Sequence, residues 1–497
     1  VAAELAAALG RSPDEVLGLI SQGDRTWVPL ARGQEESVRQ RIRDADLPGV
    51  YLEPRPLRIY PEGASTAHLL GFVSLSDDRK AYYGVEGRFN DILSGRNVNL
   101  SAAQTALQPE LLPAAAQKYL PSGAQRDLIL TIDRDIQAMV VEELVHGIEE
   151  FSADSGTVIV LKPKTGAILA SFSWPTYEPS RFYDYARDQA YEGLLLDKAV
   201  SEPYEPGSTF KVLTMAAGLD AGVIKADDTY EDPGCVTIGK REICNSNHRA
   251  PGVVNMTEVL VQSLNVGAAY ISTALGPERF YGYLTNFGIG PITEVDLQSE
   301  VPGTVRRPTD PAWSESDLAT NAFGQGITVT PIQMVTAVSA IANNGLLMRP
   351  QVASQVIVDN QMLQIKPVAV QQVVSPETAK AVTDMMVATV REGVTQAVVP
   401  GYTVAGKTGT AQLVRDGRYD PNAAIASFVG FAPAYDPQFV VLVKIEKLSG
   451  EQAWGMYVAA PIFRRIAERL FVHLGIPPDS VRQAMQPSNL AAVQPQP

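Results

Sequence analysis

Ser208 and Lys211 stand three residues apart, a spacing that could place a nucleophile beside its base. Glu205-Pro206-Gly207 breaks the chain before them, and the apolar pattern of 211–222 predicts a helix after them. Ser208 would then lie at a helix N-terminus, with Lys211 one turn along on the same face. A buried lysine that loses its proton can activate a serine hydroxyl. The same residues also fit a serine N-cap followed by a solvent-exposed lysine.

Ser263 and Asn265 form a second polar pair, placed between the predicted helical segments 256–262 and 266–275. From a turn, the hydroxyl could pass a proton and the amide could hold a substrate carbonyl. A buried capping pair is the alternative interpretation.

The third motif, Lys407-Thr408-Gly409-Thr410, lies within a strand pattern. A glycine inside a strand indicates close approach of another backbone or of a ligand. The N–H of Thr410 could complete an oxyanion hole with that of Ser208, and the lysine and threonine side chains could receive a carboxylate. A bulged edge strand with a solvated lysine is the alternative.

Two further motifs are interpreted as coincidences. Lys164-Thr165-Gly166 falls between two apolar strands, where it fits a hairpin turn. Residues 401–408 satisfy the P-loop pattern G-x-x-x-x-G-K-T, but a P-loop opens a helix, and strand formers precede this lysine. The chain has no G-x-S-x-G, which argues against a Ser-His-Asp hydrolase.

The elements that must position these motifs are far apart in the chain. A strand is predicted over 127–133 and an amphipathic helix over 134–151. Two early and three late strands flank a mostly helical region, and together they predict one sheet in an α+β domain. These five predicted strands are 156–162, 167–173, 403–414, 426–434 and 438–446. A last amphipathic helix is predicted over 458–474.

Cys235 and Cys244 are the two cysteines of the chain. Alternating apolar and polar residues on both sides of a Gly-Lys pair predict a hairpin with a two-residue turn. Counting outward from Ile238 opposite Arg241 places Cys235 opposite Cys244, within disulfide reach. A disulfide favours an oxidising compartment outside the cytoplasm, whereas two unrelated thiols would suit a cytosolic protein.

Composition argues against several classes of protein. With a net charge of −14, no broad basic face and no nucleic-acid partner are expected. None of the 4 histidines lies in HExxH or a Cys/His cluster, so no metal site is expected. The chain contains no run of about 18 apolar residues, so no membrane span is predicted. Because the chain begins at Val1, we interpret it as a processed or truncated form that has lost an anchor or signal.

In this order, S-x-x-K, S-x-N and K-T-G resemble the signature of the serine penicillin-recognising enzymes. The surrounding residues are similar to those of class B penicillin-binding proteins, from about residue 50 to about residue 475. The catalytic segments that carry this resemblance are YEPGSTFK (204–211), FGQG (323–326) with Thr330-Pro331, and GKTGTAQ (406–412). The segments resembling that class's non-catalytic pedestal are RIYP (58–61), Ala67-His68 with Gly71, and GVE (84–86).

The resemblance implies the penicillin-binding, serine-transpeptidase fold, in which helices flank a five-stranded antiparallel sheet. It implies that residues 1–125 form an elongated, dimerisation-type pedestal domain and that residues 126–476 form the transpeptidase domain. Residues 477–497 are polar, and we predict a disordered tail there.

By the same resemblance, the chain is a D,D-transpeptidase that cross-links peptidoglycan, is a target of β-lactams and needs no metal or cofactor. Lys211 would accept the proton of Ser208, which attacks the D-Ala-D-Ala carbonyl of a donor stem peptide. Ser263 would pass a proton to the leaving group, and Asn265 would orient the donor amide. An amine of a second stem peptide would then take the acyl group. The remaining oxyanion and carboxylate-binding residues are expected to be Lys407, Thr408, Gly409, Thr410 and Gln412.

Within the class, SLNVG (263–267) and the Trp313-Ser314 segment are similar to the division-type, septal enzymes. Elongation-type enzymes often carry Asp at the position of Asn265. The family implies a single-pass anchor, a location on the extracytoplasmic face of the cell membrane, and contact with a membrane glycan polymerase and division proteins.

Other functions remain as alternatives. An elongation-type transpeptidase, a β-lactamase, a β-lactam sensor and an inactive division scaffold would all keep these motifs. A β-lactamase needs a group that activates a deacylating water, and it rarely carries a pedestal. A P-loop NTPase is the alternative with a different fold.

Overall fold

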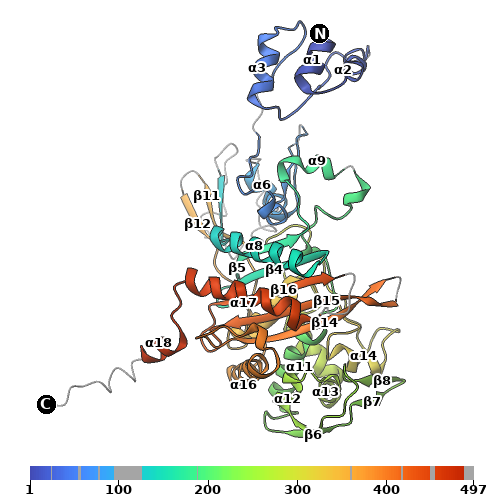
Figure 1. Ribbon diagram of the computed structural model, residues 1–497, viewed down its shortest axis with the longest axis vertical. Coiled ribbons are helices and arrows are strands. Elements are labelled where there is room, and N and C mark those ends of the chain that lie inside the picture. Colours follow the sequence, from blue (N-terminus) through green and yellow to red (C-terminus); the bar gives the residue numbers. More distant parts are fainter. Residues whose placement is uncertain are drawn as a thin grey trace, which may run out of the picture.

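The computed structural model describes residues 1–23, 25–53, 57–76, 79–94, 126–186, 188–358, 361–415, 418–447 and 454–485. The molecule is elongated, with the first helices at one end and a mostly helical region at the other (Figure 1). A sheet built from early and late parts of the chain lies between them.

This sheet has five strands, all antiparallel, in the order β14-β15-β16-β4-β5. The strands are β4 (Ser155–Lys162), β5 (Ala167–Trp174), β14 (Ala405–Arg415), β15 (Arg418–Ala432) and β16 (Phe439–Lys447). The predicted sheet of two early and three late strands is therefore confirmed, as is the α+β fold class. β14, which carries the K-T-G motif, is an edge strand with one side free of strand pairing among the described residues.

The sheet separates two hydrophobic layers, because successive side chains of a strand point to opposite faces. Val158 and Val160 of β4 face one layer, with α8 (Arg134–Phe151) and α17 (Gly455–His473). Ile159 and Leu161 face the other layer, with α11 (Lys211–Asp220), α13 (Asn265–Asn286) and α15 (Pro331–Ala342). Both amphipathic helices predicted from sequence, at 134–151 and near 458–474, are confirmed.

The helical region between β5 and β14 forms most of the second layer. α11 is buried around its whole circumference from Lys211 to Gly218, as expected for a helix inside a core. The same region contains α10 (Lys198–Ser201), α12 (Met256–Val261), α14 (Glu315–Asn321) and α16 (Pro376–Ala388), of which α16 packs against α11. Among the described residues, no helix is both long enough and apolar enough to cross a membrane.

The N-terminal part begins with a small cluster of three helices. These are α1 (Ala2–Leu9), α2 (Pro13–Ile20) and α3 (Glu36–Asp44), packed around Leu5, Val16 and Ile42. Ser12 caps α2 by accepting a hydrogen bond from the Glu15 N–H at 3.1 Å.

The sequence of residues 50–96 predicts short strands and turns, which is wrong for three segments. Among the described residues of 50–96, only β1 (Phe72–Val73) and β2 (Ala81–Tyr82) form strands. The segments 67–70, 84–88 and 90–93 form α4 (Ala67–Leu70), α5 (Gly84–Arg88) and α6 (Asn90–Leu93). Val85, Phe89 and Ile92 recur at helical spacing and are buried in the same core as α11, so packing fixes these short turns. Residues 102–125, whose Ala/Gln/Pro-rich sequence predicts a loop or linker, lie outside the described residues.

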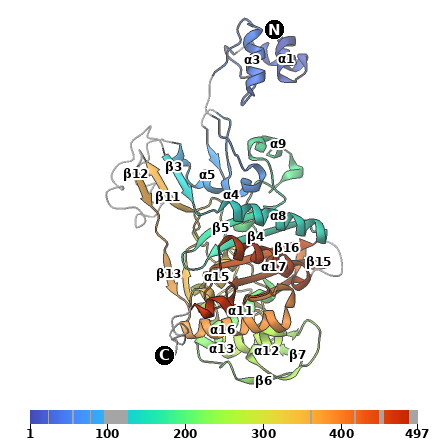
Figure 2. The same ribbon diagram turned by 60° about the vertical axis from the view of Figure 1, so that its left-hand side comes forward.

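A second, three-stranded sheet joins β3 (Arg126–Leu130) to β11 (Ala353–Val358) and β12 (Gln361–Gln364). It lies to one side of α5, above the main sheet (Figure 2). The strand predicted at 127–133 therefore pairs with a segment more than 200 residues away in the chain, a partner that local pattern does not reveal.

The prediction of a disordered tail from residue 477 was wrong for its first part. Residues 479–484 form α18 (Asp479–Ala484). Asp479 Oδ2 accepts a hydrogen bond from the Thr403 N–H at 2.6 Å, and Arg482 forms an ion pair with Asp436 at 2.8 Å. These contacts stabilise α18, a short polar helix whose composition alone does not favour a helix. Residues 486–497 lie outside the described part of the chain.

The cysteine hairpin consists of β7 (Cys235–Ile238) and β8 (Arg241–Cys244). Its predicted register is confirmed, with Cys235 opposite Cys244 and Ile238 opposite Arg241. The two cysteines form a disulfide, and their Cα atoms are 4.1 Å apart. A two-stranded hairpin alone is marginally stable in water, so the crosslink adds stability where pairing is weakest.

Replacing both Cys235 and Cys244 by serine should destabilise this hairpin by about 2–3 kcal/mol, because the crosslink no longer restricts the unfolded loop. Amide hydrogen exchange in β7 and β8 should become faster while exchange in β4 and β16 stays slow. Ser246→Ala, an exposed change just after the hairpin, is the control. Unchanged exchange in β7 and β8 of the double variant would contradict this account.

Candidate active site

Ser208 lies at the start of a buried helical segment. The 3₁₀ turn η5 (Gly207–Phe210) continues into α11, and residues from Pro206 to Gly218 are buried apart from Ser208, which is partly exposed. Gly207 has φ +55°, which lets the chain turn sharply before the serine. Neither of these two described helices has a side-chain cap, so Ser208 is not the N-cap of the alternative interpretation.

Lys211 is 1% exposed, so the alternative of a solvent-exposed lysine is wrong. Its Nζ donates to the Ser263 carbonyl oxygen at 2.6 Å and to Asn265 Oδ1 at 2.8 Å. Burial, and after it the charge of Lys407, holds the pKa of Lys211 well below its usual value, which the Asp232 carboxylate partly opposes. A neutral amine has two N–H donors and a lone pair, so it can satisfy both acceptors and still accept a proton.

The Ser263 hydroxyl lies between two lysines. Lys407 Nζ donates to Ser263 Oγ at 3.0 Å, and Lys211 Nζ lies 3.3 Å from the same oxygen. Ser263 has φ +56°, in the connection between α12 and α13. The N-cap position of α13 belongs to Leu264 and has no side-chain cap, so Ser263 and Asn265 are not a capping pair for this helix. A hydroxyl in such a position can accept one proton while it donates another.

Lys407 projects from β14 into the same polar centre and is 1% exposed, so the alternative of a solvated lysine is also wrong. Burial lowers the pKa of Lys407 to about 7. Gly409 is buried, whereas Thr408 and Thr410 are partly exposed and Gln412 is exposed. This alternation is that of an edge strand whose second face is open to a ligand.

The structure also excludes a P-loop at residues 401–408 and a catalytic role for the second Lys-Thr-Gly motif. Residues 406–408, the end of the P-loop pattern, pair with β15 and do not open a helix. The other Lys-Thr-Gly forms the turn between β4 and β5, where Lys164 is exposed and pairs with Asp436 at 3.0 Å.

Glycines let the Ser208 segment and β14 approach each other closely. A Cβ on Gly409 would lie 2.4 Å from Ser427 Oγ and 2.7 Å from the Pro206 carbonyl oxygen. A Cβ on Gly207 would lie 2.8 Å from the Thr410 carbonyl oxygen. The serine-bearing turn and the K-T-G strand are thus in backbone contact, as an oxyanion hole shared between them requires.

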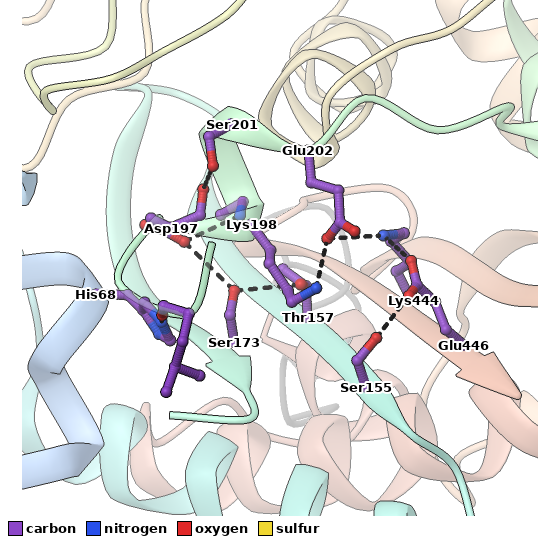
Figure 3. A network of polar contacts seen from close by, with 12 residues as sticks. His68, Ser155, Thr157, Ser173, Asp197, Lys198, Ser201, Glu202, Lys444 and Glu446 are labelled. Carbon is purple, nitrogen blue, oxygen red and sulfur yellow. Dashed lines mark hydrogen bonds and ion pairs between the residues drawn. The ribbon is translucent and has the colours of Figure 1, made fainter. Parts of the chain in front are cut away.

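A network of polar side chains ties the segment before Ser208 to the main sheet (Figure 3). Asp197, the N-cap of α10, accepts a hydrogen bond from Ser173 of β5 at 3.3 Å. Glu202, at the other end of α10, lies 3.7 Å from the buried Nζ of Lys444 on β16. The serine is therefore anchored to the same sheet that carries Lys407.

Two family models match this chain. Residues 156–468 match the penicillin-binding protein transpeptidase domain, and residues 1–98 match the penicillin-binding protein dimerisation domain. The chain belongs to the class B penicillin-binding proteins. The family and fold predicted from its three motifs are thereby confirmed.

This penicillin-binding protein is 35% identical to stage V sporulation protein D of Bacillus subtilis, over 96% of this chain and 73% of that protein. It is 30% identical to the probable peptidoglycan D,D-transpeptidase PbpC of Pseudomonas aeruginosa, over 97% of this chain and 82% of that protein. Among solved structures, penicillin-binding protein 3 of Mycobacterium tuberculosis, complexed with aztreonam, matches with a TM-score of 0.72 and 29% identity. The match covers 85% of this chain and 91% of that chain.

One contact of the penicillin-binding protein's site was missed from sequence. Asn265 Nδ2 donates to the Cys244 carbonyl oxygen at 2.9 Å, so the disulfide hairpin is part of the wall of the site. From the sequence, the two cysteines indicate a disulfide and an oxidising compartment, and they indicate no contact with the site. A backbone carbonyl carries no signal in the residue type, and therefore only the fold reveals this contact.

Gly409→Ala should slow labelling of this penicillin-binding protein by a fluorescent penicillin by about 10-fold or more, because the new methyl group separates β14 from the Ser208 turn. Gly282→Ala is the matched control, since a Cβ there meets nothing within 4 Å. Labelling of Gly409→Ala at the wild-type rate would show that the close approach is unimportant.

Proposed function

We propose that this protein is a serine D,D-transpeptidase that cross-links peptidoglycan stem peptides through an acyl-enzyme on Ser208. Two buried lysines, Lys211 and Lys407, share the hydroxyl of Ser263, and Lys211 follows Ser208 by one helical turn. This single observation carries the proposal, because the arrangement supplies a neutral base, a proton relay and a cation for a carboxylate. The name of the Pseudomonas relative, probable peptidoglycan D,D-transpeptidase PbpC, agrees with it.

Acylation begins when Ser208 Oγ attacks the carbonyl carbon of the penultimate D-Ala of a donor stem peptide. Neutral Lys211 takes the serine proton as the new C–O bond forms. The backbone N–H groups of Ser208 and Thr410 bind the oxyanion. The C–N bond to the terminal D-Ala then breaks, and the proton passes from Lys211 through Ser263 to the leaving amine.

Transfer of the acyl group reverses these roles. An amine of a second stem peptide attacks the ester on Ser208 and forms the new C–N bond of the crosslink. Its proton moves to the Lys211–Ser263 pair, the C–O bond to Ser208 breaks, and Lys211 returns a proton to Ser208 Oγ. The reaction is complete without a metal or a cofactor.

The donor carboxylate binds along the open face of β14. Lys407 supplies a positive charge, and the hydroxyls of Thr408 and Thr410 supply hydrogen-bond donors. Thr410 Oγ1 accepts a hydrogen bond from the Gly455 N–H at 3.1 Å, which leaves its own O–H proton for the ligand. Gln412, further along the same face, extends the contact to the peptide, and Asn265 orients the donor amide.

β-Lactams present a comparable carbonyl and carboxylate, and they should acylate Ser208. The solved M. tuberculosis protein is a complex with one such drug, aztreonam. The acyl group should stay on the serine because the described site is built for an amine acceptor.

We further propose a septal role, which is supported by residues 263–267. It is also supported by the peptidoglycan D,D-transpeptidase FtsI homolog of Mesostigma viride, which is 29% identical over 91% of this chain. The proposed location is the extracytoplasmic face of the cell membrane, reached through a single-pass anchor, where the Cys235–Cys244 disulfide can form. The proposed protein partners are a membrane glycan polymerase and division proteins.

Incubation with benzylpenicillin should add the mass of one drug molecule to the protein, and peptide mapping should place it on Ser208. Ser208→Ala should carry no adduct, whereas Ser246→Ala should label like the wild type. A normal adduct on Ser208→Ala would refute the assignment. Rapid release of hydrolysed drug would indicate a β-lactamase, and no adduct on the wild type would indicate a non-catalytic scaffold.

The acylation rate should have a bell-shaped pH dependence. At acid pH Lys211 gains a proton and stops acting as a base, and its depressed pKa places this limb at lower pH than for an ordinary lysine. The pKa of Lys407 is about 7, so above this pH Lys407 loses the charge that binds the carboxylate. Stopped-flow acylation between about pH 5 and about pH 10 measures both limbs. A rate that rises steadily to the alkaline end, as for an ordinary lysine base, would contradict these assignments.

A further inference from the structure

The first turn of α13 is capped from outside the helix. Its N-cap residue is Leu264, which has no polar side chain to bind the free N–H groups of the first turn. The Val266 N–H instead donates to Oδ1 of Asn245 at 3.1 Å, and Asn265 Nδ2 donates to the carbonyl oxygen of the adjacent Cys244 at 2.9 Å. The last residue of β8 and the residue after it therefore hold the helix end from which Asn265 projects.

Asn245 is itself fixed by a buried carboxylate. Its Nδ2 donates to Asp232 Oδ1 at 2.9 Å, and the two residues are 2% and 0% exposed. Asp232 Oδ1 also accepts from the Gly234 N–H at 2.8 Å, and its Oδ2 accepts from the Tyr230 hydroxyl at 2.6 Å. With both carboxylate oxygens occupied, the Asn245 amide has one orientation, with Nδ2 toward Asp232 and Oδ1 toward α13.

The same carboxylate places a second group against α13. A Cβ on Gly267 would lie 2.6 Å from the Tyr230 hydroxyl, so this tyrosine packs directly on the first turn. The Tyr230 ring stacks on Tyr270, one turn further along, with ring centroids 5.1 Å apart. Asp232 thus determines two independent contacts to the start of α13, one through Asn245 and one through Tyr230.

The position of α13 matters to Lys211, because Asn265 Oδ1 accepts a hydrogen bond from Lys211 Nζ at 2.8 Å. A carboxylate with no charge partner close by would be expensive to bury, and hydrogen bonds must compensate for this. The field of Asp232 reaches the lysine and raises the pKa of Lys211, against the lowering by burial and by Lys407.

We propose that Asp232 and Asn245 are positioning residues for the transpeptidase reaction. Asp232 orients Asn245, Asn245 caps α13, and the capped helix holds Asn265 where it aligns Lys211 and the donor amide. This inference rests on the proposed function. It assigns a mechanistic role to a segment, 230–245, that carries none of the three sequence motifs.

The first test is Asn245→Ala in the full chain, with benzylpenicillin as the probe. The acylation rate constant at saturating drug should fall about 10-fold or more, because a small displacement of an aligned group has a large kinetic effect. Asn247→Ala is the matched control in the same loop. It is exposed, and within the described part of the chain its side chain accepts a hydrogen bond only from the nearby Arg249 N–H, so its rate should match that of the wild type.

The second test is Asp232→Asn, which removes the charge and keeps the hydrogen bonds. The new Nδ2 can face Tyr230, whose hydroxyl accepts as well as donates, and Oδ1 still accepts from Gly234 and Asn245. Without the anion, protonated Lys211 is less favourable, so the acid limb of the pH–rate profile should move to lower pH. A merely structural role would leave that limb in place, and melting temperatures of both variants separate unfolding from displacement.

The outcomes separate the two levels of the proposal. If wild-type protein is acylated on Ser208 while Asn245→Ala reacts within about twofold of it, the positioning role fails and the proposed function stands. An acid limb that does not move in Asp232→Asn contradicts the action of the Asp232 charge on Lys211. If Asn245→Ala does not fold, the pH profile of Asp232→Asn decides whether Asp232 acts on the site. If wild-type protein forms no Ser208 adduct, the proposed function and the positioning role both fail.

Discussion

The site depends on the burial of two lysine amines around one serine hydroxyl. Removing an ammonium group from water costs several kcal/mol, and a second one nearby adds repulsion. Lys211 and Lys407 therefore share Ser263 only if at least one of them gives up its proton, and Lys211 loses it more readily. The surrounding fold must exclude water from this point and also leave Ser208 partly exposed beside it. A core helix and a sheet edge in backbone contact meet both requirements.

That meeting of helix and edge explains the long insertion between the strands. The sheet alone could carry Lys407 but not the nucleophile that faces it. α11 lies in the second hydrophobic layer, and the network around Asp197 and Glu202 ties the segment before it to the main sheet (Figure 3). The three polar motifs thus come from a helix start, an inter-helix turn and a strand. Their separation in sequence reflects the different supports that each role needs.

Much of this was predictable from the sequence because local patterns and packing agree. The helix at 134–151, the five strands and the register of the cysteine hairpin follow from periodicity and turn chemistry. The three motifs indicated which side chains would meet. What failed was non-local: α18 is held by Thr403 and Asp436, and the cap of α13 comes from Asn245. In each case the helix and the residues that hold it are far apart in the sequence. The tertiary fold brings them together, so a local sequence window cannot detect these contacts.

The hydrophobic layer that contains α11 also includes Leu69, Val85, Phe89 and Ile92 from the N-terminal part. His68, beside them, is buried and hydrogen-bonded to the Leu194 carbonyl oxygen at 2.7 Å. The boundary between the two family-model matches therefore runs through a shared interior and not along a surface. Cutting the chain there would expose apolar side chains on both pieces. Because apolar side chains of both parts share one core, local opening of either part exposes surface of the other.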